Sequence, residues 1–279
     1  MTLTQPKTNC LSRLFLITCS LFIFHTAIVS AQQRTNHSAA VTREQIKQTE
    51  RRLFEMGYWS GPVDGVFDAA SRWALIAFQK YEGRSINGRL TLDEIEAIQT
   101  SSAPSAKETG YEHVEVDLDR QVLLIVGAQG RVKVLPVSTG NDERFMSDGQ
   151  ESVAYTPRGR FVVYDKSFGW ENGQLGSVYY ANYISGGVAI HGYLTVPNTP
   201  ASHGCIRIPM FAAKEVSKLL KLGSIVLVYD KITFVSAKEW AQNPKLKEAA
   251  MLNAALPDYV GRSDKPALKR RPARVIRTE

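Results

Sequence analysis

A change of sequence periodicity near residue 110 restricts this chain to two dissimilar folding units. Before it, apolar residues recur three to four positions apart, as on the buried face of helices. After it, apolar and polar residues alternate in short runs separated by turn formers, as in strands. Residues 100–110, rich in Ser, Ala and Pro, lie between the two patterns and form a linker. We therefore predict an all-α module at 43–99 and a β-rich domain at 111–230.

Helix-start signals divide the module into three short helices. Thr42 and Thr91 are each followed three residues later by Gln or Glu, which is the capping-box spacing. Asp68 can cap the helix between them, and Gly57 can end the first one. The sequence thus predicts a compact three-helix unit of about 55 residues.

The second unit is predicted to be a β-sandwich or barrel-like domain with one helix. A segment at 209–222 has an apolar stripe at helical spacing and is the expected helix. Residues 169–187 are rich in Gly, Asn and Tyr, and their lack of periodicity predicts no regular element. The expected strands are 113–118, 122–126, 132–138, 160–164, 188–190 and 225–229.

The first 31 residues have the pattern of a secretory signal peptide. Lys7 and Arg13 precede an uncharged, mostly apolar run from Leu14 to Val29, and small residues surround Ala31. This run is shorter than the roughly 20 apolar residues that cross a bilayer, which disfavours the alternative of an uncleaved anchor. We predict export to the periplasm or cell wall, with membrane contact only through this signal.

Most of the net charge of +7 lies at the two ends of the chain. The segment 1–31 carries two positive charges and the tail 262–279 carries five, so the remainder sums to zero. A basic tail can bind a polyanion, or it can be a solvated terminus. No DNA-reading motif or phosphate-binding loop accompanies it, so nucleic acid is not an expected partner. Between the β-rich domain and the tail, an extension at 231–261 contains an expected helix at 238–255.

One cysteine marks the candidate site. Cys10 and Cys19 lie in the export segment, so Cys205 is the single thiol of the mature chain and has no disulfide partner there. It belongs to the polar run Ser202–Arg207, and His191 precedes it by fourteen positions. A lone thiol in an oxidising compartment is a liability, which indicates that its reactivity is used.

The neighbours of Cys205 suit nucleophilic catalysis. A histidine base within hydrogen-bond reach activates a thiol, and a helix starting close behind it would favour the thiolate. The amides of Gly204 and Cys205 could bind an oxyanion, and Arg207 suits a carboxylate.

Two alternatives stay open from the residues alone. A buried cysteine is often inert packing. His191, His203 and Cys205 could instead be three zinc ligands, although a His-x-Cys spacing is unusual and no further ligand lies nearby in sequence. We expect neither a metal nor a cofactor.

Several motifs resemble the L,D-transpeptidase (YkuD) catalytic domain. They are Thr156-Pro157-x-Gly159-x-Phe161, Ala189-Ile190-His191-Gly192, Ser202-His203-Gly204-Cys205-Ile206-Arg207 and the strand after Gly223. The resemblance implies that Cys205 is the nucleophile, His191 its general base and His203 a pocket residue. It also places Gly192, Ser202, Gly204 and Arg207 at the pocket.

The stretch between the two halves of this motif departs from the family pattern. Nine residues, Tyr193–Ala201, separate His-Gly from Ser-His-Gly-Cys, fewer than in many members. No acidic side chain lies nearby in sequence to orient His191, so we expect a backbone carbonyl in that role.

The helical module resembles the type 1 peptidoglycan-binding domain. The residues that support this resemblance are Leu53, Gly57-Tyr58-Trp59, Gly61, Val63-Asp64-Gly65-Val66-Phe67, Ala74 and Phe78-Gln79. The resemblance implies docking on cell-wall peptide or glycan through Tyr58, Trp59 and Asp64. In the alternative, these aromatic residues form the module's core and it binds nothing.

Together the two resemblances imply a peptidoglycan L,D-transpeptidase. Its partners would be peptidoglycan stem peptides and glycan, with D-alanine leaving and an amine accepting the acyl group. The acceptor can be a second stem, which gives a 3→3 cross-link, or an envelope protein. A hydrolase on the same site and a non-catalytic wall-binding protein are the alternatives.

Overall fold

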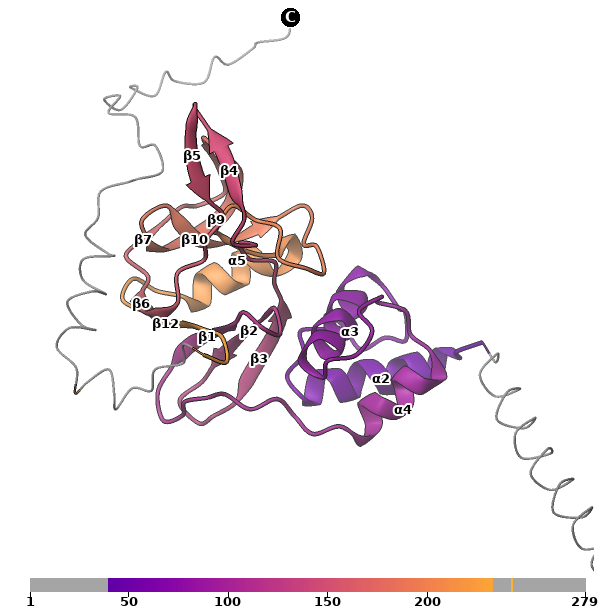
Figure 1. Ribbon diagram of the computed structural model, residues 1–279. Coiled ribbons are helices and arrows are strands. Elements are labelled where there is room, and N and C mark those ends of the chain that lie inside the picture. The colour runs from indigo at the N-terminus through magenta and orange to yellow at the C-terminus, as the bar shows by residue number, and fades with distance from the viewer. Residues whose placement is uncertain (1–39, 233–241, 243–279) are drawn as a thin grey trace, which may run out of the picture.

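The computed structural model describes residues 40–232 and residue 242 (Figure 1). The expected signal peptide and the basic tail lie outside these residues, as does the expected helix at 238–255 apart from residue 242. In the described part of the chain, no helix has the length and apolar character needed to cross a membrane.

The N-terminal unit is a three-helix module, as predicted. It consists of α2 (Arg43–Glu55), α3 (Ala69–Tyr81) and α4 (Leu92–Thr100). Thr42 forms the full capping box with Gln45, and Asp68 accepts a hydrogen bond from the Ser71 N–H at 2.9 Å. At α4 only half of the expected box forms. Thr91 caps the helix, but the Glu94 carboxylate pairs with Arg84 at 3.1 Å.

The C-terminal unit is β-rich with one helix, also as predicted. One sheet has the order β3-β2-β1-β12-β6 and the other β11-β10-β9-β7, with β8 paired to β9. The first comprises β1 (His113–Asp117), β2 (Val122–Val126), β3 (Val132–Pro136), β6 (Gly159–Val162) and β12 (Ile225–Tyr229). The second comprises β7 (Asp165–Lys166), β8 (Trp170–Gly173), β9 (Gly176–Ser185), β10 (Val188–Tyr193) and β11 (Ile206–Pro209). Buried residues of both sheets and of α5 (Met210–Leu219) share the main core.

Two hairpins were not predicted from the sequence. Residues 169–187 contain the whole of β8 and β9, although no element was expected there. The pair β4 (Arg144–Ser147) and β5 (Gln150–Val153) forms a hairpin that projects from the domain (Figure 1). β4, β5 and β8 have no fully buried position, so they lack the apolar alternation that reveals a strand.

The helical module packs on the outer face of the first sheet and is not a separate body (Figure 1). Leu53, Tyr58 and Phe78 share a core with Leu124 and with other residues of β2 and β3. The linker 100–110 is also held, since the Arg52 guanidinium donates to the Ser101 carbonyl at 2.7 Å.

Gly57 sets the closeness of this packing. Its carbonyl accepts a hydrogen bond from the Val134 N–H at 2.9 Å, and the Trp59 N–H donates to the Val134 carbonyl at 3.2 Å. A Cβ at Gly57 would lie 2.3 Å from the carbonyl oxygen of Val132. Its φ of +94° also suits the predicted helix end.

Candidate active site

His191 lies inside β10, where the sequence predicted a position just after a shorter strand. Its side chain is buried, and Nδ1 lies 3.0 Å from the carbonyl oxygen of Gly192. This is the kind of partner expected from the sequence. Because a carbonyl only accepts, Nδ1 carries the proton and Nε2 keeps its lone pair. The pKa of His191 is lowered to about 4, mainly by burial. The hydrogen bond to the Gly192 carbonyl opposes this shift, and the charge of Arg207 adds to it.

Cys205 is followed by a strand, so the helix predicted from residue 209 does not begin close to the thiol, which was the condition for its amides to favour a thiolate. β11 follows the cysteine, and α5 begins only at Met210, after Pro209. α5 also ends at Leu219, three residues before the predicted end, because Leu220 has an extended backbone. The amide dipoles of α5 therefore do not start at the thiol, and the predicted source of thiolate stabilisation is absent.

The thiol group itself is enclosed, although the residue is partly exposed. Sγ lies 3.6 Å from the carbonyl oxygen of Gly187. Burial raises the pKa of Cys205, while a backbone hydrogen bond from Ala189 and the charge of Arg207 lower it to a smaller extent. At neutral pH the resting site therefore holds a neutral thiol and a neutral imidazole.

The pairing of β10 with β11 brings the segments that carry His191 and Cys205 together. His191 is the direct partner of Arg207 in this parallel pair. Cys205 lies two residues before Arg207, directly ahead of β11. The Arg207 guanidinium lies 4.2 Å from the Tyr193 ring centre and donates to the Ala201 carbonyl at 3.1 Å. Its charge is thus fixed beside both reacting groups.

The turn before Cys205 is closed by Ser202. The Ser202 hydroxyl donates to the Cys205 carbonyl at 2.5 Å and accepts from the Gly204 N–H at 3.0 Å. The Gly204 amide is therefore already engaged, which disfavours the predicted role of this amide at an oxyanion. The Cys205 amide is the remaining candidate of the two.

Thr156 holds the same turn from the other side, and sequence reasoning used it only as a motif residue. Its buried hydroxyl donates to the Gly204 carbonyl at 2.7 Å and accepts from the Gly140 N–H at 2.9 Å. Gly204 has φ +133°, and a Cβ there would lie 2.7 Å from the Tyr155 carbonyl oxygen. The Thr-Pro-x-Gly motif was the signal that could have identified this function.

His203 contacts the β4–β5 hairpin. It is exposed, and its ring centre lies 4.5 Å from that of Phe145 on the β4–β5 hairpin, a neighbour that the sequence did not predict. No three His, Cys, Asp or Glu side chains in the described ranges gather as metal ligands. The zinc alternative built on His191, His203 and Cys205 thus has no ligand set in this part of the chain.

Gly192 has a packing role besides its carbonyl contact. A Cβ there would lie 2.6 Å from the Cβ of Ala213 on α5. The glycine therefore allows α5 to approach β10 closely behind the site.

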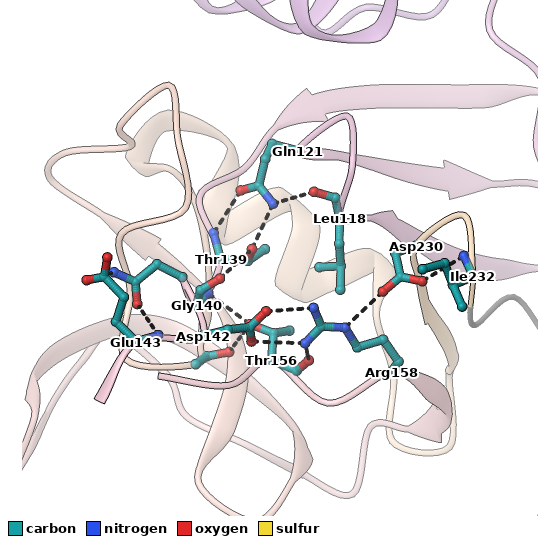
Figure 2. A network of polar contacts seen from close by, with 12 residues as sticks. Leu118, Gln121, Thr139, Gly140, Asp142, Glu143, Thr156, Arg158, Asp230 and Ile232 are labelled. Atoms are coloured by element: carbon teal, nitrogen blue, oxygen red, sulfur yellow. Dashed lines mark hydrogen bonds and ion pairs between the residues drawn. The ribbon is translucent and has the colours of Figure 1, made fainter. Parts of the chain in front are cut away.

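A polar network anchors the two ends of the β4–β5 hairpin (Figure 2). The Arg158 guanidinium contacts Asp142 at 2.9 Å, Asp230 at 3.3 Å and the Thr156 carbonyl at 2.9 Å. These contacts raise the pKa of Arg158, with the hydrogen bond to Asp142 as the largest cause. The hairpin that carries Phe145 is thus tied to the Thr156 segment.

The predicted wall-binding residues of the module have structural roles here. Tyr58 is 1% exposed and packs edge-on against Phe78, with ring centres 5.7 Å apart, so it has no face for a ligand. Trp59 is half-buried, and the Lys133 ammonium lies 4.9 Å from its ring centre. Asp64 is exposed, but its carboxylate accepts from the Val66 N–H at 2.8 Å and shapes a turn. The core interpretation therefore holds for Tyr58.

Comparisons with known proteins agree with this architecture. Residues 111–228 match the family model of the L,D-transpeptidase catalytic domain, and residues 42–98 match that of a peptidoglycan binding domain. An L,D-transpeptidase from Xylanimonas cellulosilytica (residues 123–326) is 34% identical with a TM-score of 0.63, covering 66% of this chain and 93% of that one. An L,D-transpeptidase from Stackebrandtia nassauensis is 24% identical with a TM-score of 0.40, covering 70% and 95%. Among curated proteins, none matches this sequence.

The fold and the matched relative place this protein in the transpeptidase class. The chain belongs to the L,D-transpeptidase family and carries an N-terminal peptidoglycan-binding domain.

Proposed function

We propose that this protein is an exported peptidoglycan L,D-transpeptidase that uses Cys205 as its nucleophile. The observation that supports the proposal is the parallel pairing of β10 with β11, in which His191 lies directly opposite Arg207, two residues after Cys205. The family match supports the reaction class, and the peptidoglycan-binding domain supports the substrate. Because that polymer lies outside the cytoplasmic membrane, the proposal requires export.

The first half-reaction begins from neutral groups. Nε2 of His191 takes the thiol proton as Sγ attacks the carbonyl carbon of the third stem residue, so imidazolium forms only as the thiolate is consumed. The Cys205 amide is the candidate donor to the developing oxyanion. When the tetrahedral intermediate collapses, the C–N bond breaks and His191 returns the proton to the D-alanine amine. The product is a thioester on Cys205.

The second half-reaction follows the same path in reverse. An acceptor amine attacks the thioester carbonyl, His191 takes the amine proton, and the C–S bond breaks as the thiol is reprotonated. No ATP is needed, because the thioester keeps the acyl group activated. A second stem as acceptor gives a 3→3 cross-link, an envelope-protein lysine gives a tether, and water gives a trimmed tripeptide.

Product analysis with Cys205→Ala tests this function. Purified protein is incubated with disaccharide-tetrapeptides, and products are identified by mass spectrometry. We expect cross-linked dimers and released D-alanine from the wild type, and neither from Cys205→Ala. His203→Ala is the matched control, because His203 lies in the same motif but faces Phe145, and it should keep measurable turnover.

The products separate the remaining alternatives. Tripeptide monomers without dimers would identify a hydrolase. Unchanged turnover in Cys205→Ala would overturn the proposed nucleophile. Inactive wild type that still sediments with cell-wall sacculi would indicate a non-catalytic wall-binding protein.

A further inference from the structure

We propose that residues 80–86 of the helical module position the catalytic turn, so that the module contributes to turnover and not only to wall binding. The inference rests on the proposed function of Cys205. It starts from three polar contacts that connect this stretch to the segments supporting residues 199–207.

A short support segment, Val137–Gly140, holds the catalytic turn. Ser138 exchanges two backbone hydrogen bonds with Arg207, at 3.0 and 3.1 Å, and its hydroxyl donates to the Thr199 carbonyl at 2.8 Å. The Thr139 carbonyl accepts the N–H groups of Ala201 and Ser202 at 2.8 and 2.9 Å. The backbone on both sides of Cys205 is therefore fixed to this segment.

The first module contact reaches the start of the support segment. The Lys80 ammonium, at the end of α3, donates to the Val137 carbonyl at 2.7 Å, and Lys80 is 3% exposed. Burial lowers the pKa of Lys80 to about 7. An ammonium placed in such a dry position is unfavourable unless it is hydrogen-bonded, so its bond to Val137 is costly to lose.

The second contact supports the same segment through the turn between β1 and β2. Arg120 donates from Nε to the Tyr81 carbonyl at 3.1 Å, and its guanidinium lies 4.8 Å from the Tyr81 ring centre. The next residue, Gln121, binds Thr139 through both ends of its amide, at 2.8 and 3.0 Å. The end of α3 thus fixes the turn that orients Thr139.

The third contact acts on the loop that joins the two halves of the catalytic motif. Asn198, in the short stretch Tyr193–Ala201, donates to the Ile86 carbonyl at 3.0 Å. The same stretch follows His191 directly and leads into Ser202. A loop with few residues between two fixed ends has little freedom, so holding its middle limits the relative motion of His191 and Cys205.

These contacts predict a specific kinetic defect. Small displacements of reacting groups cost rate because the bound geometry must be close to that of attack. Loss of the Lys80 or Asn198 contact should therefore lower kcat while leaving the KM for a soluble stem peptide unchanged. Sedimentation with sacculi should also be unchanged, because the inferred role of both side chains is to position the catalytic turn and not to bind the wall.

The experiment uses the full-length mature protein with Asn198→Ala, Lys80→Met and the double variant. Gln48→Ala, an exposed change on α2, is the control. Turnover is expressed per thiol of the folded fraction, which is measured by circular dichroism, so a partly unfolded sample does not imitate a loss of kcat. We expect kcat per thiol to fall roughly tenfold in Asn198→Ala and further in the double variant, a scale typical of misplaced reacting groups. Asn198→Gln, which keeps the donor, should recover part of the rate.

The outcomes separate this inference from the proposed function. If Asn198→Ala and the double variant keep kcat per thiol within about twofold of wild type, the positioning role is wrong even though Cys205→Ala stays inactive. If Lys80→Met does not fold, Asn198→Ala carries the test alone, because Asn198 is an exposed loop residue. A rise in KM without a change in kcat would also contradict the inference, since it would indicate a binding role.

Discussion

The helical module and the β10–β11 site differ in how far residue type alone reveals function. In both regions the sequence offered conspicuous residues, Tyr58 and Trp59 in one and His191 and Cys205 in the other. The structure buries Tyr58 in a core shared by the two units, whereas it assembles His191 beside the strand that follows Cys205. Aromatic side chains carry much apolar area, so burial alone accounts for them. A polar run around a lone thiol has no such packing explanation.

The largest contrast is expected from truncating one residue in each region. Cys205→Ala should abolish cross-linking, a loss of at least about a thousandfold, because no other thiol is present in the described residues. Its free energy of unfolding should change by less than about 1.5 kcal/mol, since only one sulfur atom is lost. Urea unfolding and product assays on the same sample measure both. A large loss of stability would show that Cys205 is a packing residue as well.

Tyr58→Ala should show the opposite profile. Removing a buried aromatic ring leaves a cavity and costs about 3–5 kcal/mol. Activity per folded molecule should persist unless the module detaches from β3. Tyr58→Phe is the matched control, because the Tyr58 hydroxyl has no hydrogen-bond partner in the described structure and its loss should be nearly neutral. Weakened sedimentation with sacculi in a stable Tyr58→Phe protein would instead restore a binding role.

The pH dependence of turnover tests the neutral resting state of the site. A His191 pKa of about 4 predicts that kcat/KM for a soluble stem falls only near pH 4. The unfolded chain binds a proton at this histidine below its ordinary pKa of about 6.5, and the folded chain does not until about pH 4. The contribution of His191 to the free energy of unfolding is therefore fully present above about pH 6.5. It decreases by up to about 3 kcal/mol as the pH falls to 4. A fall of kcat/KM already near pH 6.5 would instead indicate that the His191 imidazole is solvated.

Lys80 provides the corresponding test in the module. Its pKa of about 7 lies below the ordinary value of 10.5, so between these values the unfolded chain binds more protons than the folded one. The free energy of unfolding should rise with pH across this window, by up to about 5 kcal/mol. Lys80→Met should flatten this slope in urea titrations at pH 7 and pH 10. A slope equal to that of wild type would mean that Lys80 is solvated in solution.

Local signals in the sequence were sufficient where one segment determines the outcome. The caps at Thr42 and Asp68 and the helix end at Gly57 depend on neighbouring residues alone, and all three were correctly predicted. The continuation of β10 through His191 was missed, because the pairing with β9 and β11 extends that strand and comes from distant segments. The link from Lys80 to Val137 joins positions 57 residues apart, so no local pattern could indicate it.

The smallest expected effect concerns Arg207, whose charge lies beside both reacting groups. Its charge lowers the pKa of both groups, but burial has the larger effect on each, lowering the pKa of His191 and raising that of Cys205. Arg207→Gln should therefore move the acid limb of kcat/KM upward by less than about one pH unit, in line with a screened Coulomb interaction. It should also raise the thiol pKa and slow alkylation by iodoacetamide at pH 8, since less thiolate is present. Arg207→Lys keeps the charge and should leave both quantities near their wild-type values. If Arg207→Gln shifted neither, the guanidinium would act only through its contacts with Tyr193 and Ala201, and the site would depend on burial alone for its electrostatics.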